Sequence, residues 1–324
     1  MHVDLPEPEL WAYRSSLVDP ADFDAFWQEE LATSRACEGP VEVLPVGTPL
    51  RTLETADVTF PGYRGDPVRA WYRRPAGVTG DLPLVVQYVG YGGGRGHVLD
   101  NLGWASAGFA HLLMDTRGQG AGWSVGHTPD PWGTGPQQPG VMTRGIESPA
   151  TAYYPRLITD AVRAVDAGRT LPGVDPARVA VVGGSQGGAL ALAAGALADV
   201  SAVVADVPFL CDIARAVRIT DSHPFREVAA YLAVHRDREE QVLRTLSYVD
   251  GVAFARRGTV PARFTVALMD TVVPPSTVVA AHHAWAGPKE LRTWRWNGHE
   301  SGGPDEHAEA IAFVTRTLGA PDAA

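Results

Sequence analysis

Several residue types that direct other kinds of function are scarce in this chain of 324 residues. Its two cysteines, Cys37 and Cys211, form no CxxC pair, which argues against a disulfide framework or a zinc knuckle. Lysine occurs once, basic residues form no block, and the formal charge is −10, which argues against nucleic acid as a partner. No apolar run is long enough to cross a bilayer, and the opening segment lacks the basic start and apolar stretch of a signal peptide. We therefore expect a cytoplasmic protein with no membrane partner.

Short apolar strands and helical segments alternate along most of the chain. Hydrophobic residues make up 45% of it, enough for a full core. Residues 52–74 hold two strand-like runs around the turn 61–67, and after Pro83 strands and helices follow one another at the spacing of right-handed crossovers. This pattern predicts one α/β domain over 1–324. Its sheet is mostly parallel and doubly wound, with helices on both faces and antiparallel strands at the N-terminal edge.

Three segments stand outside the simple alternation. Residues 1–40 form an N-terminal helical extension whose helix we expect to begin at Asp19 and Pro20. Residues 121–150 form a long loop rich in glycine, proline and tryptophan. Residues 208–260 read as helices inserted between two strands, as in a roof over an active site. Plain decoration remains the alternative for the loop and the insertion, although structureless loops of this length are usually functional or interfacial.

The strongest local signal is the motif Gly183-Gly184-Ser185-Gln186-Gly187. It follows an apolar β-rich run and precedes a run of alanine and leucine, the strand, turn and helix context of a nucleophile elbow. Ser185 must adopt a strained positive φ for its hydroxyl to project above the sheet, and small residues on both sides let strand and helix approach. A glycine-rich turn that merely contains serine is the alternative. The correct flanks favour Ser185 as the nucleophile of an α/β-hydrolase.

A serine nucleophile needs a base, and His299 is our candidate. It lies in a glycine-rich loop after the strand at 291–296 and before the final helix, where the sheet can position it. The other histidines after Ser185 lie in helical or polar stretches or elsewhere outside such a loop: His223, His235, His282, His283 and His307.

The acid that orients the base is expected at Asp270. It ends the strand before the histidine strand, so the chain order is Ser, Asp, His, as in α/β-hydrolases. Asp250 precedes that strand, and Asp305 is expected to cap the last helix. A turn aspartate that caps the next helix is the alternative for Asp270.

Two backbone N–H groups should stabilise the oxyanion, those of Gln186 and Tyr91. Tyr91 lies in the glycine-rich loop 90–96 after the strand at 84–89. That loop also permits a weak dinucleotide-binding interpretation with Asp115 as the ribose acid, but Arg95 stands where the third glycine of G-x-G-x-x-G should be.

The tripeptide Arg117-Gly118-Gln119 follows the strand at 111–115 and should lie near the active end of the sheet. We expect Arg117 to brace loops through its planar fork of donors. A surface arginine is the alternative.

With these residues in place, the chain resembles the acetyl xylan esterase and cephalosporin C deacetylase family, carbohydrate esterase family seven. The matching motifs are Gly90-Tyr91, Arg117-Gly118-Gln119, Gly183-Gly184-Ser185-Gln186-Gly187-Gly188 and Gly298-His299-Glu300. The resemblance extends over essentially the whole chain, although Pro155 follows Tyr153-Tyr154 where the family usually has a further aromatic residue.

The resemblance implies a serine esterase that removes acetyl groups from O-acetylated sugars and small acetylated alcohols such as cephalosporin C. It implies the triad Ser185, Asp270 and His299, oxyanion donors at Tyr91 and Gln186, and a ring-shaped homo-hexamer. Arg117, Gly118, Gln119 and Glu300 would support the site. No metal and no cofactor is required by this chemistry. A carboxylesterase for other small or aryl esters, and a silent hydrolase-like scaffold, remain alternatives, and the roles of Trp123, Trp132 and Pro155 stay open.

Overall fold

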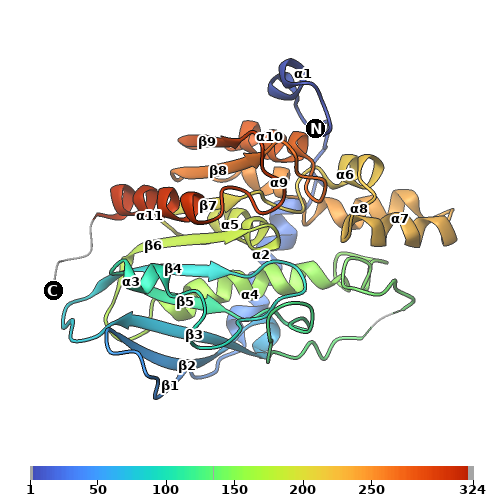
Figure 1. Ribbon diagram of the computed structural model, residues 1–324. Coiled ribbons are helices and arrows are strands. Elements are labelled where there is room, and N and C mark those ends of the chain that lie inside the picture. The colour runs from blue at the N-terminus through green and yellow to red at the C-terminus, as the bar shows by residue number, and fades with distance from the viewer. Residues whose placement is uncertain (1–2, 134, 320–324) are drawn as a thin grey trace.

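A sheet of nine strands runs through the part of the chain that the computed structural model describes, residues 3–133 and 135–319 (Figure 1). The strands lie in the order β1-β2-β3-β5-β4-β6-β7-β8-β9. Their bounds are β1 (Glu42–Pro45), β2 (Leu53–Pro61), β3 (Pro67–Pro75), β4 (Leu82–Tyr88), β5 (Ala110–Met114), β6 (Val174–Gly184), β7 (Ala202–Asp206), β8 (Ala262–Ala267) and β9 (Lys289–Trp294).

The N-terminal edge of the sheet is antiparallel, as predicted. β1 pairs with β2, β2 with β3 and β3 with β5 in antiparallel register, for example Ala70 opposite Met114. Side chains on β3 alternate between buried and more exposed positions, which is why its sequence alternates. β1 was not predicted, because its four residues are mostly exposed and carry no alternating pattern.

The remainder of the sheet is parallel. β4 pairs with β5 and β6, and β6, β7, β8 and β9 follow in parallel register. β4 and β7 are almost wholly buried, and their sequences are nearly continuous apolar runs rather than alternating ones. The predicted fold class is therefore confirmed.

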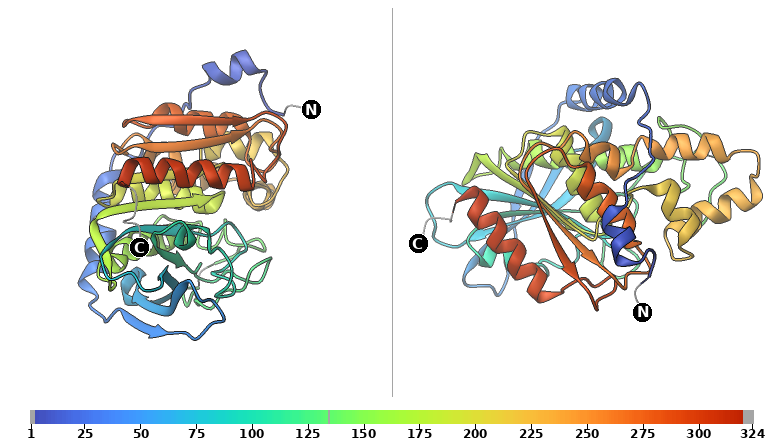
Figure 2. Two further views of the ribbon diagram at one scale, coloured as in Figure 1. Left: turned by 60° about the vertical axis from the view of Figure 1, so that its left-hand side comes forward. Right: turned by 90° about the horizontal axis from the view of Figure 1, so that it is seen from above.

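Helices cover both faces of the sheet (Figure 2). They are α1 (Glu7–Ala12), α2 (Phe23–Ala36), α3 (Gly103–Ser106), α4 (Tyr153–Gly168), α5 (Gln186–Leu197), α6 (Ile213–Ile219), α7 (Phe225–Val234), α8 (Glu239–Ser247), α9 (Gly251–Ala255), α10 (Pro275–Ala284) and α11 (Pro304–Leu318). The larger core joins α2, α4, α5, α9 and α10 to one face of the sheet. A smaller core on the other face contains Trp104 of α3 and the apolar side of α11.

Two helix starts differ from the sequence prediction. α2 begins at Phe23 after Asp22 and not at Asp19, whose carboxylate pairs with Arg256 and Arg257 instead. Gly303 precedes α11, so Asp305 lies inside its first turn and is not its cap. There its negative charge still suits the positive end of the helix dipole.

Two of the three segments set apart in the sequence, the long loop and the helical insertion, lie on one side of the molecule. In Figure 1, α6, α7 and α8 and the loop 121–150 extend together on the right. Residue 134 of this loop and residues 1–2 of the N-terminal extension lie outside the described residues. None of the helices described is both long and apolar enough to cross a membrane.

Candidate active site

Ser185 occupies the sharp turn between β6 and α5. Its φ of 56° and ψ of −119° are sparsely populated by L-residues, as the predicted elbow requires. The backbone N–H of Ser185 donates to the carbonyl of Asp206 over 2.9 Å, which fixes the turn against β7. A Cβ atom at Gly183 would overlap the backbone of Gly187, and one at Gly187 would overlap the carbonyl of Tyr88. Both positions therefore require glycine.

The structure brings the three predicted polar side chains into one hydrogen-bonded chain. His299 Nε2 lies 3.0 Å from Ser185 Oγ, and His299 Nδ1 lies 2.8 Å from Asp270 Oδ2. Asp270 is buried, and its other oxygen accepts the N–H groups of Val272 and Val273 at 2.8 and 2.9 Å. The carboxylate is thereby held in place while one oxygen faces the imidazole. This geometry can move a proton from Ser185 to His299 and back.

The three residues meet because β6, β8 and β9 are parallel. Each residue follows the carboxyl end of its strand, and those ends lie along one edge of the sheet. The loop that carries His299 is itself braced. Glu300 accepts the N–H of Gly298 at 3.1 Å, and Ser301 Oγ donates to Asp206 Oδ1 over 2.7 Å. Glu300 thus supports the loop from within and contacts no other element through these bonds.

The N–H groups of Tyr91 and Gln186 have no acceptor among the residues that the structure describes. Gln186 is the first residue of α5, where a helix offers its N–H no internal partner. Gln119 joins the two turns that carry these donors: its Oε1 accepts the N–H of Gly92 at 2.6 Å, and its Nε2 donates to Gln186 Oε1 over 3.0 Å. Sequence reasoning placed Gln119 near the site but could not name these partners.

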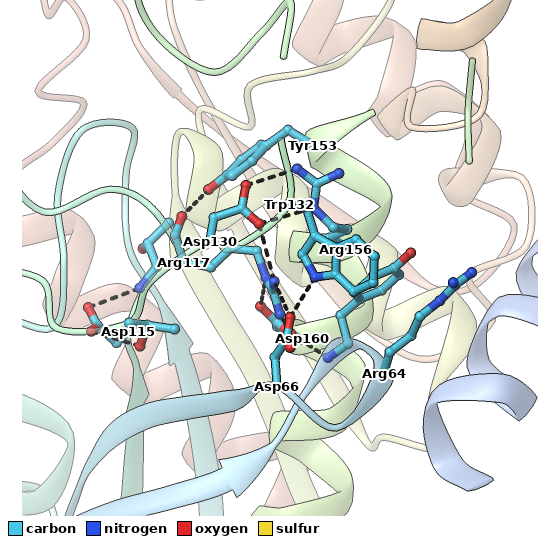
Figure 3. Close-up of polar contacts among 12 residues, drawn as sticks. Arg64, Asp66, Asp115, Arg117, Asp130, Trp132, Tyr153, Arg156 and Asp160 are labelled. Carbon is cyan, nitrogen blue, oxygen red and sulfur yellow. Dashed lines mark hydrogen bonds and ion pairs between the residues drawn. The ribbon is translucent and has the colours of Figure 1, made fainter. Parts of the chain in front are cut away.

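Arg117 braces the loops around the site from a fully buried position (Figure 3). Its Nε and Nη2 atoms donate to both oxygens of Asp160 on α4, at 2.5 and 2.8 Å. Its Nη1 atom donates to Asp66 in the β2–β3 turn over 3.0 Å and to Asp130 in the long loop over 3.4 Å. Its carbonyl accepts the hydroxyl of Tyr153 at 2.6 Å. These contacts join α4, the β2–β3 turn and the long loop, and Arg117 is not a surface residue.

Gly118 follows with a φ of 63°, and a Cβ there would crowd Asp130. Trp132 also joins this cluster, because its Nε1 donates to Asp66 over 2.7 Å and its ring packs edge-on against Tyr63. Pro155 sits in the first turn of α4, where a missing N–H costs no helical hydrogen bond, and it does not line the cavity at Ser185.

The rival residues have other tasks. Asp250 caps α9 and accepts the N–H groups of Asp212, Ile213 and Val252. Asp115 is fully buried and accepts hydrogen bonds from three backbone N–H groups and the Thr128 hydroxyl, so no oxygen is left for a ribose. The described residues contain no cluster of three His, Cys, Asp or Glu side chains that could hold a metal ion.

A cavity of about 480 Å³ opens beside Ser185 and His299. Its lining includes Tyr91, Trp123, Asp206, His223 and Val272. A larger groove of about 880 Å³ lies between residues 13–22 and the helices α6 and α8, and it contains none of the three residues of the Ser185 chain. We therefore place the candidate site in the smaller cavity.

Sequence reasoning missed two carboxylates near this cavity, one partly buried and one buried. Asp206 ends β7 beside Ser185, and Glu227 on α7 is 3% exposed. Glu227 Oε1 accepts the hydroxyl of Tyr91 at 2.6 Å, and its Oε2 accepts the N–H of Met142 at 3.0 Å. Asp206 could have been found from its place at the end of a buried strand. Nothing local in the sequence marks Glu227, which lies in an ordinary amphipathic helix.

Comparisons with known proteins agree with this geometry. The family model described as acetyl xylan esterase (AXE1) matches residues 1–317. The acetyl esterase Axe7A of Xylanibacter ruminicola is 29% identical over 289 residues, which are 87% of this chain and 64% of that protein. This chain therefore spans less than two thirds of the length of that relative.

Two solved structures are similar over nearly the full length. An acetyl xylan esterase from Paenibacillus sp. R4 is 38% identical with a TM-score of 0.92, and covers 97% of this chain and 100% of its own. Acetyl xylan esterase 1 from Thermoanaerobacterium sp. JW/SL YS485 is 30% identical with a TM-score of 0.90, and covers 98% and 100%. This chain belongs to the acetyl xylan esterase family and has the α/β-hydrolase fold.

Proposed function

We propose that the protein is a serine esterase that removes acetyl groups from O-acetylated xylo-oligosaccharides and other small acetylated alcohols. The observation that carries the proposal is the unbroken chain from Ser185 through His299 to Asp270, with spacings of 3.0 and 2.8 Å. Beside it lie two backbone N–H groups that have no acceptor within the described part of the chain. Membership of the acetyl xylan esterase family supports acetate as the acyl group.

In the proposed reaction, Ser185 Oγ attacks the acetyl carbonyl carbon while His299 Nε2 takes the hydroxyl proton. The tetrahedral oxyanion accepts hydrogen bonds from the N–H groups of Tyr91 and Gln186. Loss of one such donor typically costs about 3 kcal/mol in the transition state. The bond from carbon to the sugar oxygen then breaks, and His299 gives its proton to the leaving alcohol. Water, deprotonated by His299, attacks the acetyl carbon; the bond from that carbon to Ser185 Oγ then breaks, and His299 returns the proton to Oγ, which releases acetate and free Ser185.

Replacement of Ser185 by alanine tests the proposal directly. We expect turnover of p-nitrophenyl acetate and of acetylated xylo-oligosaccharides to fall by about 10⁶-fold, because a triad acts as a unit. A circular dichroism spectrum identical to wild type would show that the variant is folded. Serine-independent release of acetate by the folded variant would contradict the mechanism, and an inactive wild-type protein would indicate a silent scaffold.

We further propose a preference for short acyl groups and a range of alcohols that includes cephalosporin C. In one assay series, p-nitrophenyl acetate should be hydrolysed at least about tenfold faster than the butyrate, because a pocket that fits acetyl excludes two extra methylene groups. Equal rates would argue against a small acyl pocket. Acetate release from cephalosporin C and from acetylated xylo-oligosaccharides would define the range of alcohols.

We also propose that the chain works in the cytoplasm as a ring-shaped homo-hexamer, as its resemblance to carbohydrate esterase family seven implies. Both cysteines are free thiols, as in proteins of a reducing compartment. Light scattering coupled to size-exclusion chromatography should give about six times the chain mass of 34.5 kDa. A monomeric mass would contradict the assembly, and recovery outside the cytosolic fraction of the source cells would contradict the location.

A further inference from the structure

Trp123 lies at the cavity that holds Ser185 and His299 and remains 66% exposed. An aromatic ring that is exposed at the edge of this cavity offers its surface to a molecule bound beside Ser185. We propose that Trp123 is a stacking platform for the sugar ring of the substrate, on which a pyranose lies while its acetyl group reaches Ser185. This inference rests on the proposed esterase function and extends it to the recognition of the alcohol.

The indole is held rigidly through one edge. Its Nε1 atom donates to the carbonyl of Tyr91 over 2.8 Å. A Cβ at Gly93 would collide with Cζ2 of the indole, while Cβ atoms at Gly90 and Gly92 would lie 3.6 and 3.8 Å from Cζ2 and Cδ1. The edge of the indole that carries Nε1 thus packs against the glycine-rich turn. The remainder of the ring is the part that is exposed to solvent. Such pre-ordering lowers the entropy that a ligand must overcome on binding.

The hydrogen bond from Trp123 to Tyr91 places the indole close to the proposed oxyanion donor. Trp123 bonds to the carbonyl of Tyr91, and the N–H of the same residue is a proposed oxyanion donor. An acetyl carbonyl bound at that N–H is therefore held by the same residue that anchors the indole. The alcohol attached to that acetyl group is then within reach of the exposed part of the indole.

The chemistry of the cavity suits a saccharide. The C–H groups on a face of a pyranose are polarised, and they are attracted to the electron-rich face of an aromatic ring. Sugar hydroxyls need hydrogen-bonding partners, and the same cavity is lined by the polar side chains of Asn101, Asp206 and His223. An apolar platform beside polar groups matches a ring with apolar faces and a polar rim.

The test compares two substrates and three variants. The substrates are acetylated xylobiose, which offers a pyranose ring, and ethyl acetate, which offers none. The variants are Trp123→Ala, Trp123→Phe and Val125→Ala, the last a control because Val125 is 59% exposed on the same loop and lies outside the residues that line the cavity.

We expect Trp123→Ala to raise KM for acetylated xylobiose by about tenfold or more, while kcat/KM for ethyl acetate changes by less than about threefold. Phe at this position keeps an aromatic face but cannot donate to Tyr91, so it should recover most of the affinity for xylobiose. Val125→Ala should behave as wild type with both substrates.

A purely structural role for Trp123 predicts another pattern. Loss of its hydrogen bond to Tyr91 would then lower kcat for both substrates by one common factor, in the Phe variant as well as in the Ala variant. That pattern would overturn the platform and leave the esterase proposal intact. Failure of the wild-type enzyme to hydrolyse either substrate would instead overturn the proposed function itself.

A second measurement does not depend on turnover. Ser185→Ala protein should bind acetylated xylobiose with a change in tryptophan fluorescence, and the double variant Ser185→Ala/Trp123→Phe should bind with a much smaller change. Equal fluorescence changes in the two proteins would contradict contact between the sugar and Trp123.

Discussion

Asp206, which lies outside the Ser185–His299–Asp270 chain, contacts the serine turn through its backbone and the histidine loop through its side chain. The carbonyl of Asp206 accepts the N–H of Ser185 at 2.9 Å, and its Oδ1 accepts the hydroxyl of Ser301 at 2.7 Å. Burial raises the pKa of this carboxyl to about 7, and the negative charge of Glu306 adds to the rise. Asp206 therefore contacts both the serine turn and the histidine loop, and the folded protein favours the protonated form of its carboxyl group.

The raised pKa predicts a pH-dependent effect of Asp206→Asn. An unfolded aspartate titrates near pH 4, so between about pH 4 and 7 the native protein holds a proton that the unfolded chain lacks. The free energy of unfolding contributed by Asp206 must then fall as pH rises through this range. The asparagine of the variant does not titrate. The stability of the variant relative to wild type should rise by roughly 2–3 kcal/mol between pH 5 and pH 8.

Urea unfolding of both proteins at the two pH values measures this difference. Asp250, whose pKa burial also raises to about 7, is common to both proteins and cancels. A stability difference that stays constant from pH 5 to pH 8 would show that Asp206 is already ionised in the native state.

At the scale of residues, chemistry with a local signature could be predicted from sequence. Ser185 lies in a motif with its own flanks, and His299 and Asp270 follow strand ends in a fixed order. Gln119 was named, but its bonds to Gly92 and Gln186 depend on three turns that only the folded sheet brings together. Hydrogen-bond partners of this kind have no characteristic separation in the sequence, so they could not be predicted from it.

At the scale of elements, Glu227 links three segments that are distant in sequence. It lies on α7, it accepts the hydroxyl of Tyr91 from the glycine-rich turn, and it accepts the N–H of Met142 from the end of the long loop. The hydroxyl of Tyr91 in turn accepts the N–H of Val141 at 2.8 Å. The inserted helices and the long loop therefore both bear on the proposed oxyanion donor.

Glu227→Gln should weaken the contacts of this side chain with Tyr91 and Met142 while a side chain of nearly the same size still fills the position. An amide has one acceptor oxygen, so either Tyr91 or Met142 would face an NH₂ group in place of a carboxylate oxygen. Because the oxyanion donor acts in the transition state, we expect kcat to fall by about tenfold with KM nearly unchanged. Arg226→Ala on the exposed side of the same helix is the matched control. An unchanged kcat in Glu227→Gln would show that the turn holds Tyr91 without help from α7.

Arg117 also links segments that are distant in the sequence, and one of them is the long loop 121–150. Its fork binds α4, the β2–β3 turn and the long loop at once, and all of its donors are buried. Lysine cannot reproduce the paired bonds to Asp160, so Arg117→Lys should lower the free energy of unfolding by roughly 3–5 kcal/mol. Arg35 also binds an aspartate with two bonds, but it is half exposed, and Arg35→Lys should cost less than about 1 kcal/mol. Urea unfolding of both variants measures the two losses in the free energy of unfolding. Equal losses would contradict the idea that burial makes the ion pairs of Arg117 more important.

The start of α2 shows why element boundaries were harder to predict than elements. Asp19 and Pro20 have the composition of a helix start, and the apolar face behind them was correct. In the structure, Asp19 instead forms ion pairs with Arg256 and Arg257, more than 200 residues further along the chain. The helix begins after Asp22. A tertiary ion pair overrides a local preference of about 1 kcal/mol.

At the scale of the whole molecule, the order of apolar runs already specified the architecture. Nearly continuous apolar runs form the central parallel strands β4 and β7, which are covered on both faces, and the alternating run forms β3 at the antiparallel edge. The strand order could not be obtained in this way, since β5 lies between β3 and β4 and no local pattern states which strands become neighbours.

The shared sheet leads to a last prediction, about unfolding. Strands β4, β6 and β7 contribute side chains to the larger core through one face and to the smaller core through the other. Neither core can lose its packing without disturbing the strands that form the second. We therefore expect one cooperative transition in urea, with far-ultraviolet circular dichroism, tryptophan fluorescence and loss of acetate release following the same midpoint at a given protein concentration. Two resolved transitions would mean that the antiparallel edge or the inserted helices fold as a separate unit, and the chain would then comprise more than the single domain that its sequence predicts.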